Sequence, residues 1–94
     1  MYQLQATNVF KKSIKRLPQN IKKKLESKLN FLVSDPNHPS LRTKKNNSWS
    51  IKYNKTVFES SIDMSYRFIW VYSEDEQDII ILYMAGDHDI VDFK

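Results

Sequence analysis

The chain has 94 residues, of which 40% are hydrophobic. This length is enough for one domain with a modest core, over residues 1–94, and too short for two domains. It contains no cysteine, which excludes disulfide bonds and thiolate zinc sites and gives no reason to expect an oxidising compartment. The net charge of +4 is unevenly distributed: residues 1–45 carry eleven Lys or Arg against two Asp or Glu, whereas residues 46–94 carry four against nine. A basic half is typical of nucleic-acid binding, although a solvated helix surface has the same composition.

The first third of the chain predicts a strand and two helices. In MYQLQA, residues 1–6, apolar and polar residues alternate with the period of a half-buried strand. Thr7 is suited to cap the helix that follows, in which apolar residues recur at helical spacing until Pro18 interrupts the pattern. A second helix begins near residue 19 and ends before SDPNHPS, where two prolines forbid its continuation. The two helices should form a hairpin with a dense positive surface.

The rest of the chain is rich in β-branched and aromatic residues and predicts four strands. They are SWSIKY (48–53), TVFESSI (56–62), YRFIWVY (66–72) and DIIILYM (78–84). Their connections are short and polar, as in hairpins, which indicates an antiparallel meander. The expected fold is therefore α+β: an N-terminal strand and a helical hairpin packed on one face of a small antiparallel sheet, in the order β-α-α-β-β-β or, with all four runs counted, β-α-α-β-β-β-β, with the other face partly open.

Targeting and cofactor signals are missing from the sequence. The N-terminus lacks the apolar stretch of a signal peptide, and no window approaches the ~20 apolar residues of a membrane span, so we expect a cytoplasmic protein that does not bind membranes. The two histidines are fifty residues apart, which disfavours a metal site, and no glycine-rich phosphate loop or catalytic triad is present. We therefore expect neither a metal nor another cofactor.

Three segments carry a resemblance to a known family. DPNHPSLR follows the second helix, YRFIW lies in a central strand, and GDHD follows the last strand. In this order and spacing they resemble the RelE/ParE superfamily, the toxins of bacterial toxin-antitoxin modules, and most of all the subgroup described as cytotoxic translational repressors. The similarity spans nearly the whole chain. It implies the RelE-like fold described above and a cognate antitoxin as protein partner.

The resemblance leaves the target open. RelE-type members enter the ribosomal A site and cut messenger RNA by attack of a ribose 2′-hydroxyl on the adjacent phosphate, so ribosome and mRNA are the implied partners of a type II toxin of this kind. ParE-type members share the fold but inhibit gyrase. The fold alone therefore does not identify the target. A non-catalytic gyrase inhibitor, or a degenerate toxin that acts only as a binding module, is therefore the alternative to an endoribonuclease.

Three residues are the catalytic candidates. Arg67 matches the strand arginine of the family and interrupts an otherwise apolar strand face, where its guanidinium would grip a phosphate or form an ion pair with Glu59. His88 matches a histidine that several members carry after the last strand and is suited to proton transfer. Glu59 stands where better-studied members have lysine, and it would act as a base, orient Arg67 or pair with a lysine. Because neighbouring antiparallel strands run in opposite directions, Arg67 and His88 should lie at the same end of the sheet.

A second group of residues is expected to bind RNA. Arg42, Lys44 and Lys45 precede Trp49 in a basic loop suited to phosphate contacts, and Lys52 joins them. Phe93 is the candidate for stacking on a base, although Asp92 stands where many relatives have tyrosine, and a carboxylate beside a phosphate is unfavourable. The expected structural features are His38, placed in a turn between two prolines, and Gly86, which should let the backbone turn sharply out of the last strand.

Overall fold

The computed structural model describes residues 1–92 of the chain. Its elements are β1 (Gln3–Ala6), α1 (Asn8–Lys15), α2 (Gln19–Ser34), the 3₁₀ helix η1 (Pro39–Leu41), β2 (Lys44–Lys45), α3 (Asn47–Tyr53), β3 (Phe58–Ser61), β4 (Tyr66–Tyr72), β5 (Ile79–Asp87) and the 3₁₀ helix η2 (His88–Val91). The predicted N-terminal strand, helical hairpin and last three strands are therefore present. No helix among these residues is long and apolar enough to cross a membrane.

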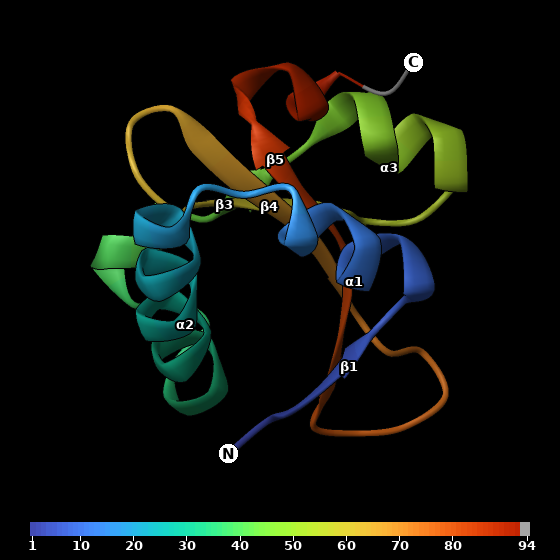
Figure 1. The fold of residues 1–94 in the computed structure, drawn as a ribbon. Helices are drawn as coiled ribbons and strands as arrows, with labels where there is room; N and C mark the ends of the chain where they lie inside the picture. Colours follow the sequence, from blue (N-terminus) through green and yellow to red (C-terminus); the bar gives the residue numbers. More distant parts are fainter. Residues whose placement is uncertain (93–94) are drawn as a thin grey trace.

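The five strands form one sheet in the order β1-β5-β4-β3-β2 (Figure 1). The pairs β2–β3, β3–β4 and β4–β5 are antiparallel, as expected for a meander. β1 differs from the expectation of an antiparallel sheet, because it pairs parallel with β5 and makes the sheet mixed. A parallel pair needs a long crossover connection, and the whole length of chain between Ala6 and Ile79 supplies one.

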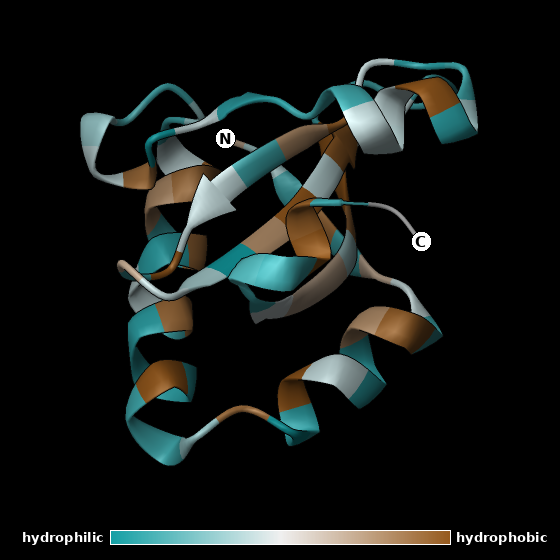
Figure 2. Cartoon of the chain, turned by 90° about the horizontal axis from the view of Figure 1, so that it is seen from above, coloured by the Kyte–Doolittle hydropathy of each residue, from teal (hydrophilic) through white to brown (hydrophobic). Residues whose placement is uncertain are grey.

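The helical hairpin covers one face of the sheet, as predicted. Thr7 caps α1 by accepting a hydrogen bond from the Phe10 amide at 3.0 Å, and Pro18 occupies the N-cap position of α2. Hydrophobic and hydrophilic residues alternate in bands along α2 (Figure 2). The main core joins these helices to the inner residues of the central strands, and its buried members are Phe10, Leu17, Ile21, Leu25, Leu32, Leu41, Ile62, Phe68, Trp70, Ile80, Leu82 and Ala85.

The prediction of a strand at SWSIKY is wrong, because these residues belong to α3. Asn46 caps this helix with its side-chain oxygen, and Asn54 ends it in the left-handed conformation at φ 53°. Helical spacing places Trp49 and Tyr53 on one side, where their rings stack at 5.7 Å, and leaves Ile51 exposed. A short apolar run fits a strand and a helix equally well, and here the asparagines at both ends favour the helix because they cap it.

The face opposite the helical hairpin is more covered than expected. α3 and η2 pack on it and form a second, smaller core of Trp49, Val57, Ile69 and Val71, with Ile81, Tyr83, Met84 and Ile90 against it. The alternation predicted for β4 holds, since Phe68 and Trp70 belong to the main core and Ile69 and Val71 to this second one. Both faces of the central strands are therefore buried.

Candidate functional site

Arg67 and His88 lie at the same end of the sheet, as the strand directions predicted. Arg67 is directly opposite Gly86 on β5, and Tyr66 is opposite Asp87, the residue before His88. On its other side Arg67 is opposite Ser61 of β3. The start of β4, the end of β3 and the end of β5 therefore meet here.

The Arg67 side chain turns toward the connection between β3 and β4. Its Nη1 donates to the carbonyl oxygens of Asp63 at 2.5 Å and Tyr66 at 3.0 Å, and more distantly to Ser61 Oγ at 3.4 Å. Within residues 1–92 it forms no ion pair with Glu59, and its other two guanidinium nitrogens donate to no protein group. One edge of the guanidinium is thus held by the turn, and the other edge remains available for an anion.

Arg67 lines a cleft of about 680 Å³ between α2, η1 and the β3–β4 turn, which we call the basic cleft. Its lining residues are Lys24, Ser27, Lys28, Phe31, Ser40, Arg42, Ser61, Ile62, Asp63, Met64 and Arg67. Two predicted residues, Arg42 and Arg67, are thereby brought together although they are distant in sequence. Lys28 donates to the Ser40 carbonyl at 2.7 Å, and Lys24 lies 3.6 Å from the Asp63 carboxylate.

Sequence reasoning did not single out Lys24 and Lys28 for this cleft. Both belong to the lysine-rich surface expected of the helical hairpin, and their spacing of four residues places them on one side of α2. That spacing is the one feature of the sequence that pairs these two lysines. Only the packing of α2 beside the β3–β4 turn distinguishes these two from the other lysines.

Glu59 lies apart from the basic cleft, on the face that α3 and η2 cover. It is opposite Ile69 on β4 and Lys44 on β2, and it is buried with 7% of its surface exposed. Its Oε1 accepts a hydrogen bond from Asn46 Nδ2 at 3.0 Å. The carboxylate is therefore oriented by an amide, in place of the expected arginine or lysine.

His88 is exposed at the first position of η2. The flanking Asp87 caps this helix by accepting from the Asp89 amide at 3.0 Å. Gly86 does not provide the expected sharp turn, since it lies inside β5 and its φ is not positive. A Cβ atom at Gly86 would instead lie 2.7 Å from Ile90 Cγ2, so the glycine allows η2 to fold back closely over the strand.

The remaining RNA-binding candidates are distributed around α3 and the sheet edge. Lys44 and Lys45 form the short edge strand β2, where the sequence predicted a loop, and both are exposed, as is Lys52 on α3. Phe93 lies outside the described residues. No group of three His, Cys, Asp or Glu side chains that could hold a metal ion occurs among residues 1–92.

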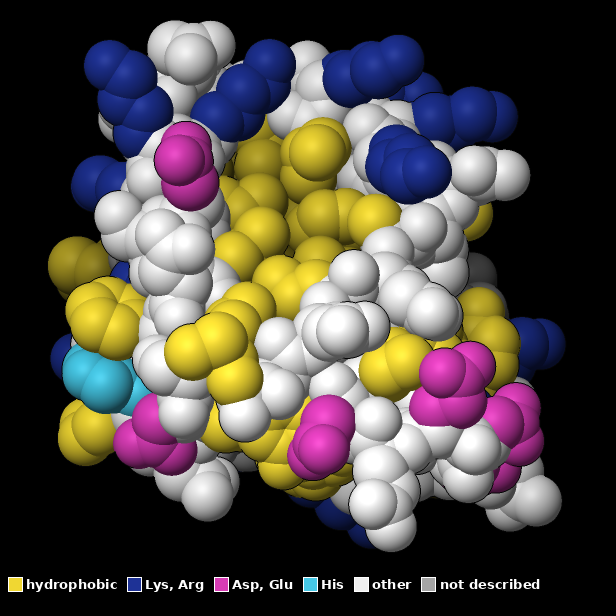
Figure 3. Space-filling model, turned by 90° about the horizontal axis from the view of Figure 1, so that it is seen from below, with side chains coloured by type: hydrophobic (Ala, Val, Ile, Leu, Met, Phe, Trp, Pro, Cys, Tyr) yellow, Lys and Arg dark blue, Asp and Glu magenta, His cyan; other side chains and the backbone are white. Residues whose placement is uncertain are grey.

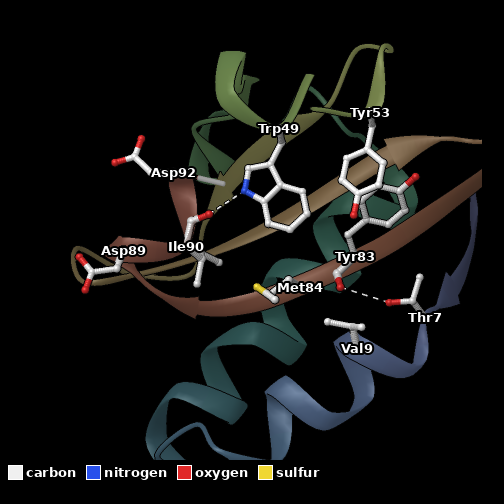
Figure 4. A pocket seen from close by; sticks show the side chains of 9 residues that line it. All are labelled: Thr7, Val9, Trp49, Tyr53, Tyr83, Met84, Asp89, Ile90 and Asp92. Atoms are coloured by element: carbon white, nitrogen blue, oxygen red, sulfur yellow. Dashed lines mark hydrogen bonds between the residues drawn. The ribbon is translucent and has the colours of Figure 1, made fainter. Parts of the chain in front are cut away.

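A second cavity, of about 650 Å³ and largely apolar, lies between α1, α3 and η2 (Figure 4). It is lined by Thr7, Val9, Trp49, Tyr53, Tyr83, Met84, Asp89, Ile90 and Asp92. Tyr83 lies on this face by alternation with Ile81, and the shift of the β4–β5 register next to Ile69, which leaves Tyr83 without a partner on β4, brings the following Met84 to the same face. The sequence did not predict this cavity, because it depends on that irregularity and on α3 being a helix.

A third hollow, of about 300 Å³, separates α1 from α2. Ile14, Leu25 and Leu29 provide its apolar surface, and Lys15, Lys22 and Glu26 also line it. Figure 3 shows this face of the molecule, with hydrophobic side chains gathered in a central depression and Lys and Arg side chains around its upper end.

The comparisons with known proteins identify the fold. No protein-family model matches the chain, and no curated sequence matches it either. Solved structures do match: a metal-bound toxin from Helicobacter pylori (18% identity, 96% of this chain and 98% of that chain, TM-score 0.74), YafQ from E. coli (14%, 97% and 98%, 0.71) and the archaeal RelE–RelB complex from Pyrococcus horikoshii (12%, 92% and 93%, 0.71). The fold of this chain is that of the RelE-like toxins, and the resemblance seen in the sequence is confirmed at that level.

Proposed function

We propose that this protein is the toxin of a type II toxin-antitoxin module and that it inhibits translation by cutting messenger RNA at the ribosome. The main supporting observation is the basic cleft, which collects Arg42 and Arg67 with Lys24 and Lys28 on a RelE-like fold. Such a concentration of cations is suited to a polyanionic backbone. Several proteins of this fold are toxins whose structures were solved with antitoxins, including RelE with RelB and YafQ with DinJ.

The proposed reaction assigns a role to each candidate residue. A ribose 2′-hydroxyl gives its proton to a base and attacks the adjacent phosphate, and the bond to the 5′-oxygen breaks as that oxygen takes up a proton from an acid. The free edge of the Arg67 guanidinium stabilises the charge on the phosphate, and His88 transfers a proton at this end of the sheet. Glu59 is the third candidate, as a base. Arg42, Lys44, Lys45 and Lys52 contact RNA phosphates, and Phe93 stacks on a base.

The test of this function is primer extension on translated mRNA with purified protein. The parent should cut within the ribosomal A site, Arg67→Ala should abolish the cuts, and His88→Ala should lower the rate about 10²-fold or more. His38→Asn is the matched histidine control. His38 Nδ1 accepts from the Ser40 amide at 3.1 Å and its ring stacks on Phe31, and asparagine retains an acceptor for this cap. Cleavage that survives loss of His88 would remove this residue from the mechanism.

The alternative is a ParE-like gyrase inhibitor or a degenerate toxin. Two observations favour it: Glu59 is buried and bound by an amide away from the basic cleft, and Asp92 stands where many relatives have a tyrosine, four residues after His88. Absence of any cleavage by the parent, combined with inhibition of DNA supercoiling by gyrase, would establish the gyrase inhibitor. Absence of both activities would favour the degenerate toxin.

The cognate antitoxin is the expected protein partner, and the hollow between α1 and α2 is its proposed site. An acidic segment with apolar side chains fits this surface, because Ile14, Leu25 and Leu29 are apolar and Lys15 and Lys22 are positive. Co-expression with the protein encoded next to this chain should give a complex that dissociates more readily at high salt. Lys15→Glu with Lys22→Glu should weaken it, and unchanged affinity would place the antitoxin elsewhere.

A further inference from the structure

The 3₁₀ helix η2, which begins with His88, is tied to a segment that lies more than forty residues earlier in the chain. Trp49 Nε1 donates to the Ile90 carbonyl at 2.7 Å (Figure 4), and Asn46 Nδ2 donates to the Val91 carbonyl at 2.7 Å. Both donors belong to the start of α3 or its cap. We call these two residues the C-terminal anchor.

Asn46 connects η2 to Glu59 as well. Its Nδ2 donates to Glu59 Oε1 at 3.0 Å, and its Oδ1 accepts from the Trp49 amide at 2.8 Å. An amide group has two N–H donors on its nitrogen, and both have acceptors here. The side chain is 4% exposed, so loss of one partner would leave a buried polar group unsatisfied. One buried amide therefore joins β3, α3 and η2.

We propose that Asn46 and Trp49 are positioning residues that fix the segment carrying His88 relative to Glu59. Ile90, packed against the bare backbone of Gly86, is held by the same contact, because Trp49 binds its carbonyl. The anchor sets where η2 crosses the sheet, and His88 is the first residue of that helix. This role rests on the function proposed above, although the anchor itself can be measured without any activity.

Asn46→Asp separates positioning from helix capping. Aspartate caps a helix as well as asparagine does, so the bond to the Trp49 amide is retained. A carboxylate has no proton to donate to Val91 or Glu59, so both of those bonds are lost. The double variant Asn46→Asp with Glu59→Gln exchanges the amide and the carboxylate. Glutamine at position 59 then donates to aspartate at position 46, whereas the bond to Val91 is still lost. This exchange serves as the second variant if the single one folds poorly.

Hydrogen exchange of the two tryptophan indole N–H groups, followed by NMR, reports on the anchor directly. Trp49 donates to η2, whereas Trp70 donates to Ser60 Oγ in the main core at 2.8 Å and is the internal reference. In Asn46→Asp, and equally in the double variant, the Trp49 indole should exchange roughly 3- to 10-fold faster, as expected for loss of the one hydrogen bond from Asn46 to η2, while Trp70 is unchanged. Unchanged exchange at Trp49, or an equal rise at both indoles, would overturn the proposal.

Cleavage kinetics test the positioning role itself. Asn46→Asp should lower kcat about 10- to 100-fold with KM nearly unchanged, because the RNA-binding lysines are untouched while the hydrogen bonds that hold η2 and Glu59 are lost. A faster-exchanging Trp49 with parental kcat would overturn the positioning role. If the parent protein does not cleave RNA, the proposed function fails, and the indole exchange still decides whether the anchor holds η2.

Discussion

Gly86 lies in β5 beneath η2, and its lack of a side chain has a specific consequence. A Cβ atom here would come within 2.7 Å of Ile90 Cγ2, a distance at which one of the two groups must move. Ile90 is branched at Cβ and held through its carbonyl by Trp49, so it has little freedom to withdraw. This single position therefore controls how closely η2 approaches the sheet.

Gly86→Ala should lower the free energy of unfolding. Overpacking of this kind costs about 1–3 kcal/mol, which exceeds the roughly 0.5–1 kcal/mol that alanine gains over glycine in a strand. Urea denaturation of the variant and the parent measures the difference. Ile90→Ala removes the clashing methyl groups and is the matched control: in that background Gly86→Ala should cost much less. An equal loss in the free energy of unfolding in both backgrounds would show that the methyl group added at position 86 does not contact Ile90.

At the scale of elements, α3 joins the smaller core to β3 and η2. It supplies Trp49 to the smaller core, and its cap Asn46 binds Glu59 and Val91. The helix exists because two asparagines define its ends, Asn46 through its side chain and Asn54 through a positive φ. An extended segment would place Trp49 and Ile51 on the same face and would lose the Trp49–Tyr53 stack.

Asn54→Val tests the C-terminal end of α3. A β-branched residue in the left-handed conformation costs about 1–2 kcal/mol, so the free energy of unfolding should fall by this amount. Asn54→Gly is the control, because glycine adopts a positive φ without strain, and it should be as stable as the parent. Thermal and urea denaturation compare the three proteins. Equal stability of Asn54→Val and the parent would mean that α3 does not depend on this cap.

The molecule as a whole is electrically polarised, with a charge of +9 over residues 1–45 and −5 over residues 46–94. In the folded protein, the positive and negative side chains are not evenly distributed over the surface. Lysines and arginines of α2, η1 and the β3–β4 region meet in the basic cleft, and Lys44 and Lys45 extend the positive surface along the edge strand β2. Three carboxylates, by contrast, are close together in sequence at the C-terminal segment, at Asp87, Asp89 and Asp92. Such polarity favours one orientation on a polyanion.

Neutralising the edge strand tests whether this surface contacts RNA. Lys44→Gln with Lys45→Gln should weaken sedimentation with ribosomes and reduce the slope of log affinity against log salt by about two, one for each lost phosphate contact. Glutamine avoids a carboxylate opposite Glu59 on the neighbouring strand. Lys11→Gln with Lys12→Gln on α1 removes the same charge elsewhere and should change the slope less. Equal changes for both pairs would mean that net charge alone governs binding.

The sequence by itself determined the elements whose signals are local. Alternation predicts β1 and β4 because side chains of a strand point to opposite faces, and helical spacing with Thr7 and the prolines predicts α1 and α2. The strand directions alone placed Arg67 and His88 at one end of the sheet. These features follow from neighbouring residues or from chain order, so the amino-acid sequence is sufficient to read them.

Only the tertiary structure decided which distant groups meet. The parallel pairing of β1, the basic cleft of Arg42, Arg67 and two helix lysines, and the separation of Glu59 from that cleft all depend on packing between segments far apart in the chain. The anchor formed by Asn46 and Trp49 spans more than forty residues. Such contacts have no periodic signature in the sequence, because their geometry arises only when the layers pack and each buried polar group must find a partner.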